Sequence, residues 1–169
     1  MIERAIQRAI EKRIKRGYDY TYWAIDIHDT LVPSTYTYPN KYDYHKYDYM
    51  LKSMIFLSAM KDMKIILWSC TPRDKVQEVI DDLKTYGINI DYFNENPECE
   101  PLSMQDFSGK FYFDIGVDDK FGFDPETDWK LIYSHVRTIR SFGLEEYLER
   151  VKNNEISIRV DDDGKLKEI

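Results

Sequence analysis

Apolar residues recur along the chain in stripes and runs that predict alternating helices and strands. Ile2, Ile6, Ile10 and Ile14 stand at helical spacing and predict an opening helix within residues 1–17 that ends at Gly17. β-branched and aromatic residues predict strands over 20–27, 64–68, 88–93 and 111–117. Helical spacing returns over 50–60, 72–87, 129–140 and 144–152. Strands that alternate with helices predict an α/β fold with a mostly parallel sheet covered on both faces.

The remaining segments predict loops and a single domain. Residues 33–47 are polar and rich in Tyr, and residues 94–109 carry no regular pattern, so both predict loops. A last strand over 156–160 is followed by a turn at Asp163-Gly164 and a short end that can pair back as a hairpin. A chain of 169 residues has room for one core, so residues 1–169 predict one domain.

Composition narrows the class of protein and its compartment. A formal charge of −7 gives no general attraction for nucleic acid, and the basic residues of the first 16 positions are interpreted as a solvated helix face. No apolar run approaches the ~20 residues that cross a bilayer. Two cysteines without CxxC spacing, Cys70 and Cys99, indicate neither a disulfide scaffold nor a zinc site. We therefore expect a soluble, cytoplasmic protein without a membrane partner.

Polar residues that could carry chemistry follow three of the predicted strands. Asp26 ends the first, Ser69 follows the second, and Asp118 and Asp119 follow the fourth, with Lys110 just ahead of it. In open α/β sheets, ligands bind at the carboxyl ends of the strands. Carboxylates suit Mg²⁺, and a hydroxyl and an ammonium can hold phosphoryl oxygens. These residue types fit phosphoryl transfer better than any other reaction class. Thr71 is the alternative to Ser69 as the hydroxyl that binds phosphate.

The same residues resemble the motifs of the haloacid dehalogenase-like superfamily, in the family's order over roughly residues 20–125. YWAIDIHDTLV resembles its first motif, IILWS the second, and FDIGVDDK the metal-binding motif. The resemblance implies a three-layer, Rossmann-like fold with a small loop-type cap formed by residues 33–47. It makes Asp26 the nucleophile, and Ser69 and Lys110 the phosphate-binding residues. It assigns Mg²⁺ to Asp26, Asp118, Asp119 and the backbone carbonyl of His28.

His28 departs from this resemblance, because the family has a second Asp at that position as the general acid/base. Imidazole has an ordinary pKa of ~6.5 and could exchange protons near neutrality. His28 is therefore either a working catalytic acid/base or a sign of lost or altered chemistry. Asp29 could replace it only if the turn presents its carboxylate to the pocket.

We therefore expect a Mg²⁺-dependent phosphomonoester hydrolase that forms an aspartyl-phosphate at Asp26. With so small a cap, its phosphorylated substrate could be large, such as a phosphoprotein or a phosphorylated nucleic acid end. One alternative is a catalytically impaired module that binds metal or phosphate. Another is a protein that binds a partner through the Tyr-rich loop, although packing of about half of those tyrosines on the body explains the loop more simply.

Overall fold

The computed structural model describes residues 1–35, 37–39, 41–156, 158–160 and 166–168. Its elements are α1 (Ile2–Arg16), β1 (Thr21–Ile25), α2 (Met50–Ala59), β2 (Met63–Leu67), α3 (Arg73–Thr85), β3 (Tyr92–Phe93), β4 (Ile115–Val117), the 3₁₀ turn η1 (Asp119–Phe121), α4 (Asp128–Phe142), α5 (Leu144–Lys152), β5 (Ile158–Val160) and β6 (Leu166–Glu168). Strands that alternate with helices confirm the predicted α/β class.

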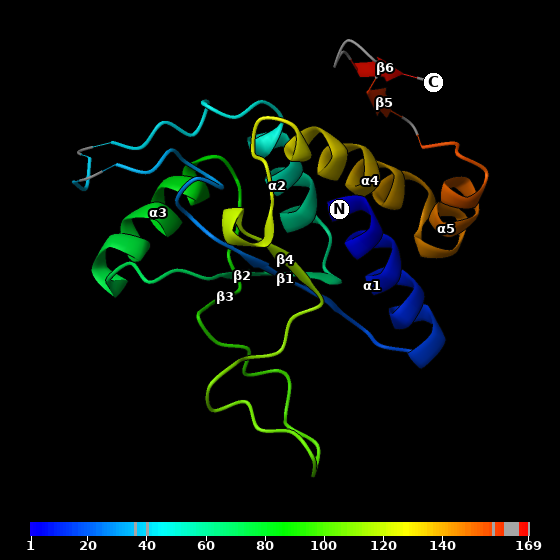
Figure 1. The fold of residues 1–169 in the computed structure, drawn as a ribbon, viewed down its shortest axis with the longest axis horizontal. Coiled ribbons are helices and arrows are strands. Elements are labelled where there is room, and N and C mark those ends of the chain that lie inside the picture. The colour runs from blue at the N-terminus through cyan, green and yellow to red at the C-terminus, as the bar shows by residue number, and fades with distance from the viewer. Residues whose placement is uncertain (36, 40, 157, 161–165, 169) are drawn as a thin grey trace.

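The first four strands form one parallel sheet in the order β3-β2-β1-β4 (Figure 1). The central strand β1 pairs with β2 from Thr21↔Met63 to Ile25↔Leu67. It also pairs with β4 as far as Ile25↔Val117. The sheet is flanked by five helices and is consistent with the predicted three-layer, Rossmann-like fold. Because all four strands are parallel, their carboxyl ends meet at one edge of the sheet.

Helices α1, α2, α4 and α5 lie together on one side of the sheet (Figure 1). The predicted isoleucine stripe of α1 faces the core, where Ile6 and Ile10 are fully buried. Trp129 of α4 is also fully buried, and its Nε1 donates to the carbonyl of Thr30 at 2.8 Å. This bond ties α4 to the turn that follows β1, which also carries His28 and Asp29.

Aromatic side chains cover the sheet around Gly116 of β4. A Cβ at Gly116 would lie 2.9 Å from the ring of Phe121 and 3.2 Å from that of Phe113. Both rings also lie beside Trp68, with centroids 5.3 and 5.7 Å away. Gly116 therefore leaves the space in which these rings pack. Phe113 belongs to the connection between β3 and β4, which projects from the body opposite the helices in Figure 1.

β1 covers Thr21–Ile25 and not 20–27, and β3 and β4 are each four residues shorter than the sequence predicts. In β3 and β4, side-chain carboxylates replace backbone partners in the ladder. β3 covers Tyr92–Phe93 and not 88–93. Just before it, Asp91 accepts from the backbone N–H of Ile65 at 2.8 Å. β4 covers Ile115–Val117 and not 111–117. There, Asp114 accepts from the backbone N–H of Tyr22 at 3.0 Å.

The Tyr-rich segment has no helix or strand in its described residues, 33–35, 37–39 and 41–47, as predicted. Tyr42, Tyr44 and Tyr47 are buried, while Tyr38 remains 48% exposed. Tyr44 also donates from its hydroxyl to Asp82 of α3 at 3.1 Å. The packing of these tyrosines on the body agrees with the simpler interpretation of the loop.

The end of the chain forms a hairpin apart from the main sheet. β5 pairs with β6 antiparallel, with Arg159 opposite Lys167. This pairing confirms the predicted hairpin, although its turn at 163–164 lies outside the described residues. Within the described part of the chain, no helix combines the length and apolar character needed to cross a bilayer.

Candidate functional site

Three carboxylates meet where β1 and β4 end. The backbone N–H of Asp26 donates to the carbonyl of Val117 at 2.9 Å, which continues the β1–β4 pairing and brings Asp26 beside Asp118. Asp118 accepts from the backbone N–H of Lys120 at 2.8 Å and caps η1. Asp26, Asp118 and Asp119 each offer an oxygen within 4.8 Å of the others. The fold thus gathers the three acids that the sequence assigns to a metal.

The surroundings of Asp26 favour its neutral form. Its pKa is raised to about 6, mainly by burial and also by the negative charges of Asp118 and Asp119, while a hydrogen bond from the Ile27 backbone lowers it in part. A divalent cation would relieve this repulsion, because carboxylate oxygens are the ligands that Mg²⁺ prefers. The donor set therefore fits the metal that the sequence predicts.

The carboxylates line an open cavity of about 630 Å³. Its other lining residues come mainly from the segments after β1 and β2 and from the start of η1: His28, Asp29, Ser34, Thr35, Thr37, Tyr38, Trp68, Ser69, Cys70, Thr71 and Lys120. The carboxyl edge of the sheet thus presents acids, hydroxyls and one ammonium to the same space.

Ser69 and Thr71 enter the cavity as a hydrogen-bonded pair. Ser69 Oγ donates to Thr71 Oγ1 at 2.9 Å, and the backbone N–H of Thr71 donates to Ser69 Oγ at 3.2 Å. Asn94 fixes the Ser69 backbone from both sides, accepting from its N–H at 2.9 Å and donating to its carbonyl at 2.7 Å. Both of the hydroxyls that the sequence offered therefore lie together.

His28 also lines the cavity, half-buried in the turn after β1. Its Nδ1 lies 3.5 Å from Thr71 Oγ1. Burial lowers its pKa, and the charge of Asp29 opposes that shift only in part. The imidazole is therefore mainly neutral near neutral pH, which suits a proton acceptor better than a proton donor.

Asp29 lines the same cavity from a left-handed backbone conformation, with φ of 53°. Its Oδ1 accepts from the backbone N–H of Ser34 at 2.9 Å. Hydrogen bonding from Ser34 lowers the pKa of Asp29, so this carboxylate stays ionised. It therefore cannot act as a proton donor in this state, and its bond to Ser34 holds the start of the Tyr-rich segment.

The structure places Lys110 outside this cavity. Lys110 lines a neighbouring hollow of about 440 Å³, which shares Trp68 with the first cavity. Its Nζ lies 5.6 Å from the ring centroid of Phe113, and Phe111 packs edge-on against Trp68. Packing of these aromatic rings positions the segment, and it directs the ammonium over a ring.

Lys120 provides the ammonium that lines the cavity instead. Its Nζ pairs with Asp119, and its side chain is 77% exposed. The sequence carried a signal for it, because Lys120 directly follows the acidic pair at the end of β4. The phosphate-binding role of Lys110 remains a prediction, while Lys120 is the lysine that lines the cavity with the three acids.

Comparisons with known proteins give one structural relative. No family model matches the chain, and no curated protein matches it. Among solved structures, a conserved protein coded by a locus from Bacteroides thetaiotaomicron is similar, with a TM-score of 0.53 and 24% sequence identity. The match covers 70% of this chain and 90% of that one. This likeness shows the fold alone.

Proposed function

We propose that the protein is a Mg²⁺-dependent phosphomonoester hydrolase with Asp26 as nucleophile. The observation that carries the proposal is the meeting of Asp26, Asp118 and Asp119 within 4.8 Å, in a cavity also lined by Ser69 and Lys120. Hydrolysis of a phosphoryl group needs a nucleophile, neutralisation of charge and donors to the phosphoryl oxygens. The cavity offers side chains for each requirement.

Asp26, Asp118, Asp119 and the backbone carbonyl of His28 would hold the metal. When bound, Mg²⁺ supplies positive charge that lowers repulsion between the carboxylates and an incoming phosphoryl group. The hydroxyls of Ser69 and Thr71 and the ammonium of Lys120 would bind the phosphoryl oxygens. These donors would oppose the charge that builds as the reaction proceeds.

The reaction would proceed in two displacements. A carboxylate oxygen of Asp26 forms a bond to phosphorus while the ester oxygen leaves with the electron pair of the broken P–O bond. Water then attacks the aspartyl-phosphate, which releases inorganic phosphate and restores the carboxylate. His28 would accept a proton from that water and return it to solvent. Because the imidazole is mainly neutral, it would rarely donate a proton to an alkoxide leaving group.

Two thiols fit the compartment that we propose for this activity. Cys70 and Cys99 are both free in the structure. Free cysteines persist in the reducing cytoplasm, where disulfides are rare. We therefore place the proposed hydrolase there.

The test is hydrolysis of 4-nitrophenyl phosphate with Mg²⁺ by the wild type, Asp26→Asn and Asp81→Asn. Asp81 is an exposed acid on α3 that does not line the cavity, so its variant controls for the loss of a charge. We expect activity in the wild type and Asp81→Asn and a loss of ~10³-fold or more in Asp26→Asn. Equal turnover in all three proteins would exclude Asp26 as nucleophile.

A non-catalytic module that binds metal or phosphate is the second candidate, and His28 favours it. The imidazole stands where the resembled family has its acid/base carboxylate, and burial lowers its pKa. Such a module would bind Mg²⁺ and inorganic phosphate in calorimetric titrations without hydrolysing aryl phosphates. Hydrolysis by the wild type would reject this alternative.

A further inference from the structure

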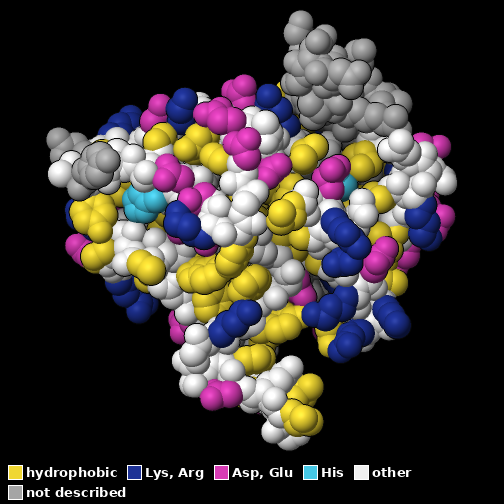
Figure 2. Space-filling view, in the orientation of Figure 1, with side chains coloured by type: hydrophobic (Ala, Val, Ile, Leu, Met, Phe, Trp, Pro, Cys, Tyr) yellow, Lys and Arg dark blue, Asp and Glu magenta, His cyan; other side chains and the backbone are white. Residues whose placement is uncertain are grey.

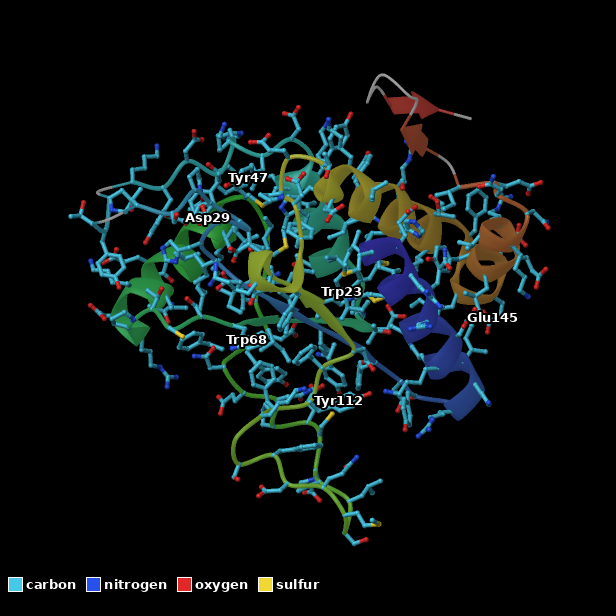
Figure 3. All side chains as sticks on the ribbon, in the orientation of Figure 1. Trp23, Asp29, Tyr47, Trp68, Tyr112 and Glu145 are labelled. Atoms are coloured by element: carbon cyan, nitrogen blue, oxygen red, sulfur yellow. The ribbon has the colours of Figure 1, made fainter. Side chains whose placement is uncertain are left out.

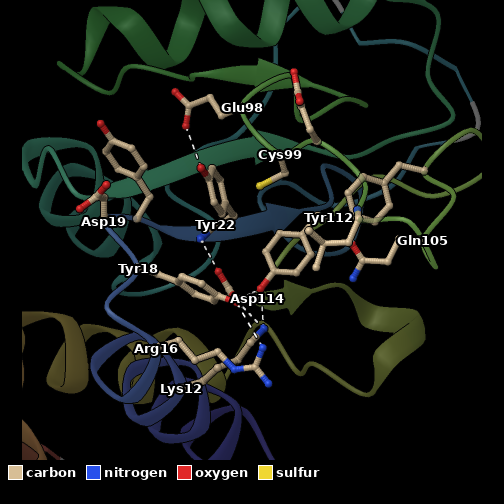
Figure 4. A pocket seen from close by; sticks show the side chains of 14 residues that line it. Lys12, Arg16, Tyr18, Asp19, Tyr22, Glu98, Cys99, Gln105, Tyr112 and Asp114 are labelled. Carbon is tan, nitrogen blue, oxygen red and sulfur yellow. Dashed lines mark hydrogen bonds and ion pairs between the residues drawn. The ribbon is translucent and has the colours of Figure 1, made fainter.

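A second cavity of about 630 Å³ lies at the opposite, amino-terminal edge of the sheet (Figure 4). The last turns of α1, the start of β1 and the connection between β3 and β4 enclose it. Of the described residues that line it, none lines the cavity of Asp26. The two spaces are therefore separate sites on one sheet.

The floor of this cavity is a closed polar network around Asp114. Its carboxylate accepts from the Tyr112 hydroxyl at 2.6 Å and from the Tyr22 backbone at 3.0 Å, and it pairs with Lys12 at 3.3 Å (Figure 4). The side chain of Asp114 is only 6% exposed. Asp114 and Lys12 therefore cancel each other's charge and leave neither free to attract a ligand.

Aromatic rings make up much of the wall. Tyr22 and Tyr112 meet edge to face, with centroids 6.1 Å apart and an interplanar angle of 85°. Phe107 lies 6.3 Å from Tyr112, and Tyr18 is 43% exposed on the same side as α1. Rings held at different angles present both edges and faces, which bind another ring or a cation.

The charge that remains in the cavity is negative. Beyond the Lys12–Asp114 pair, the lining carries the carboxylates of Asp19, Glu98 and Glu100 against the single guanidinium of Arg16. Lys64, which does not line the cavity, pairs with Glu98 at 3.6 Å and with Asp91 at 3.2 Å, so its one ammonium faces two carboxylates. Arg16, Asp19 and Glu100 are all exposed, so solvent screens their charges alike, and Arg16 Nη1 donates to the Tyr18 hydroxyl at 3.3 Å. A cationic ligand therefore gains more here than an anionic one.

Glu98 is the anchor that the cavity offers to such a cation. It accepts from the hydroxyls of Tyr22 at 3.0 Å and Tyr92 at 2.7 Å, which orient both of its oxygens. Burial raises its pKa, but these hydrogen bonds and the nearby ammonium of Lys64 outweigh burial and lower the pKa overall. The carboxylate is held in one place and stays ionised.

We propose that this cavity binds a small aromatic amine. The ring of the ligand would pack among Tyr22, Tyr112 and Phe107, and its ammonium would pair with Glu98. The proposal concerns a site independent of the proposed hydrolase. Its test therefore does not depend on whether Asp26 carries out the proposed chemistry.

The test is a calorimetric titration with tyramine, and with 3-(4-hydroxyphenyl)propionate as the anionic analogue of similar size and ring. For a ligand of this size we expect a Kd of about 1 mM or below for tyramine, and at least tenfold weaker binding of the propionate. Glu98→Gln has nearly the same shape but no charge: its carbonyl oxygen accepts from one of the two tyrosines, and its NH2 group can donate to the other hydroxyl. It should weaken tyramine about tenfold. Glu145→Gln, an exposed acid on α5 (Figure 3), should change nothing.

Amide chemical shifts provide a second measurement that needs no variant. Tyramine should shift the amide signals of Tyr22, Cys99 and Tyr112 and leave those of Asp26 and Ser69 in place. Absence of binding at about ten times the expected Kd would overturn the proposal. Equal affinity for the propionate, equal binding by Glu98→Gln and Glu145→Gln, or shifts confined to the Asp26 cavity would also overturn it.

Discussion

The two edges of the sheet treat carboxylates in opposite ways. At the carboxyl edge, Asp26, Asp118 and Asp119 face one another, and among the described lining residues the exposed Lys120 is the one lysine or arginine. At the amino edge, the same strands hold Asp114 among three donors. The three acids at the carboxyl edge repel one another, and a bound cation would relieve that repulsion. The charge of Asp114 at the amino edge is neutralised by groups of the fold itself. One edge is suited to binding, and the floor of the other to stability.

The space-filling view shows how these sites relate to the surface. In Figure 2, yellow side chains gather on the face below the helices, and the connection between β3 and β4 projects beneath them. This connection carries Phe107, which lines the amino-edge cavity, and Lys110, which lines the hollow beside Trp68. Phe107 also lines that hollow, so one loop contributes to two adjoining spaces, and the effects of changes in the loop should be measured at both edges of the sheet.

After the loss expected in Asp26→Asn, the largest expected effect concerns His28 at the carboxyl edge. His28→Asp restores a carboxylic acid at the position that the resembled family uses for proton transfer. We expect it to raise hydrolysis of an alkyl phosphate such as glycerol phosphate by ~10²-fold, because a poor leaving group needs a proton. For 4-nitrophenyl phosphate the gain should be small. Equal gains for both esters, measured as kcat/KM, would argue against an acid/base role.

At the amino edge, Asp114→Asn should reduce the free energy of unfolding by about 2 kcal/mol. The amide has no charge to neutralise Lys12. Its nitrogen replaces one carboxylate oxygen and cannot accept a hydrogen bond. Urea unfolding followed by circular dichroism measures the change. Asp81→Asn, at an exposed position on α3, serves as the control. A loss as small in Asp114→Asn as in the control would show that the network stabilises little.

The structure and the sequence prediction differ in the lysine that lies near the proposed phosphate site. The sequence predicted Lys110, and the structure has Lys120 in the lining of the cavity. Lys120→Met should lower kcat/KM for 4-nitrophenyl phosphate about tenfold, since an exposed ammonium contributes less than a buried donor. Lys110→Met should change it less, because its ammonium lies over Phe113. The reverse order would show that Lys110 reaches the phosphoryl group when substrate is bound.

The smallest effect is a stabilisation. In EDTA at pH 7, Asp26→Asn should raise the free energy of unfolding by about 1 kcal/mol, about a third of what the full pKa shift implies, because solvent screens this half-buried carboxylate. The pKa of Asp26 rises from its ordinary 3.8 to about 6 in the folded protein. The folded state therefore holds more protons in that window, and stability falls as pH rises through it. The gain in Asp26→Asn should disappear at pH 4, where urea unfolding can be repeated.

Local patterns in the sequence carried much of this structure. The apolar run that ends in Asp26 predicted β1 and its terminal acid, and the stripe of isoleucines predicted α1 and its buried face. The resemblance put Asp118 beside Asp26, and the parallel register of β1 and β4 explains why they meet. Chemistry at the ends of parallel strands is predictable because the topology brings those ends together.

Contacts between segments distant in the sequence could not be predicted from local patterns. Lys12 and Asp114 are separated by 102 positions, and no local pattern marks them as partners. The amino-edge cavity depends on how the loop after β3 folds back beside α1, which periodicity does not describe. The place of Lys110 likewise depends on aromatic packing around Trp68. The predicted lengths of β3 and β4 were wrong for a related reason, because the side chains of Asp91 and Asp114 accept hydrogen bonds from backbone groups of neighbouring strands.

The most direct test of the contrast between the two edges is thermal unfolding in Mg²⁺ and in EDTA. We compare the wild type, Asp118→Asn at the carboxyl edge and Asp114→Asn at the amino edge. Mg²⁺ should add about 1–3 kcal/mol to the wild type at concentrations well above Kd. Asp114→Asn should gain the same amount from a lower starting stability, and Asp118→Asn should gain almost nothing. Equal gains in both variants, or no gain in the wild type, would contradict a metal site at the carboxyl edge.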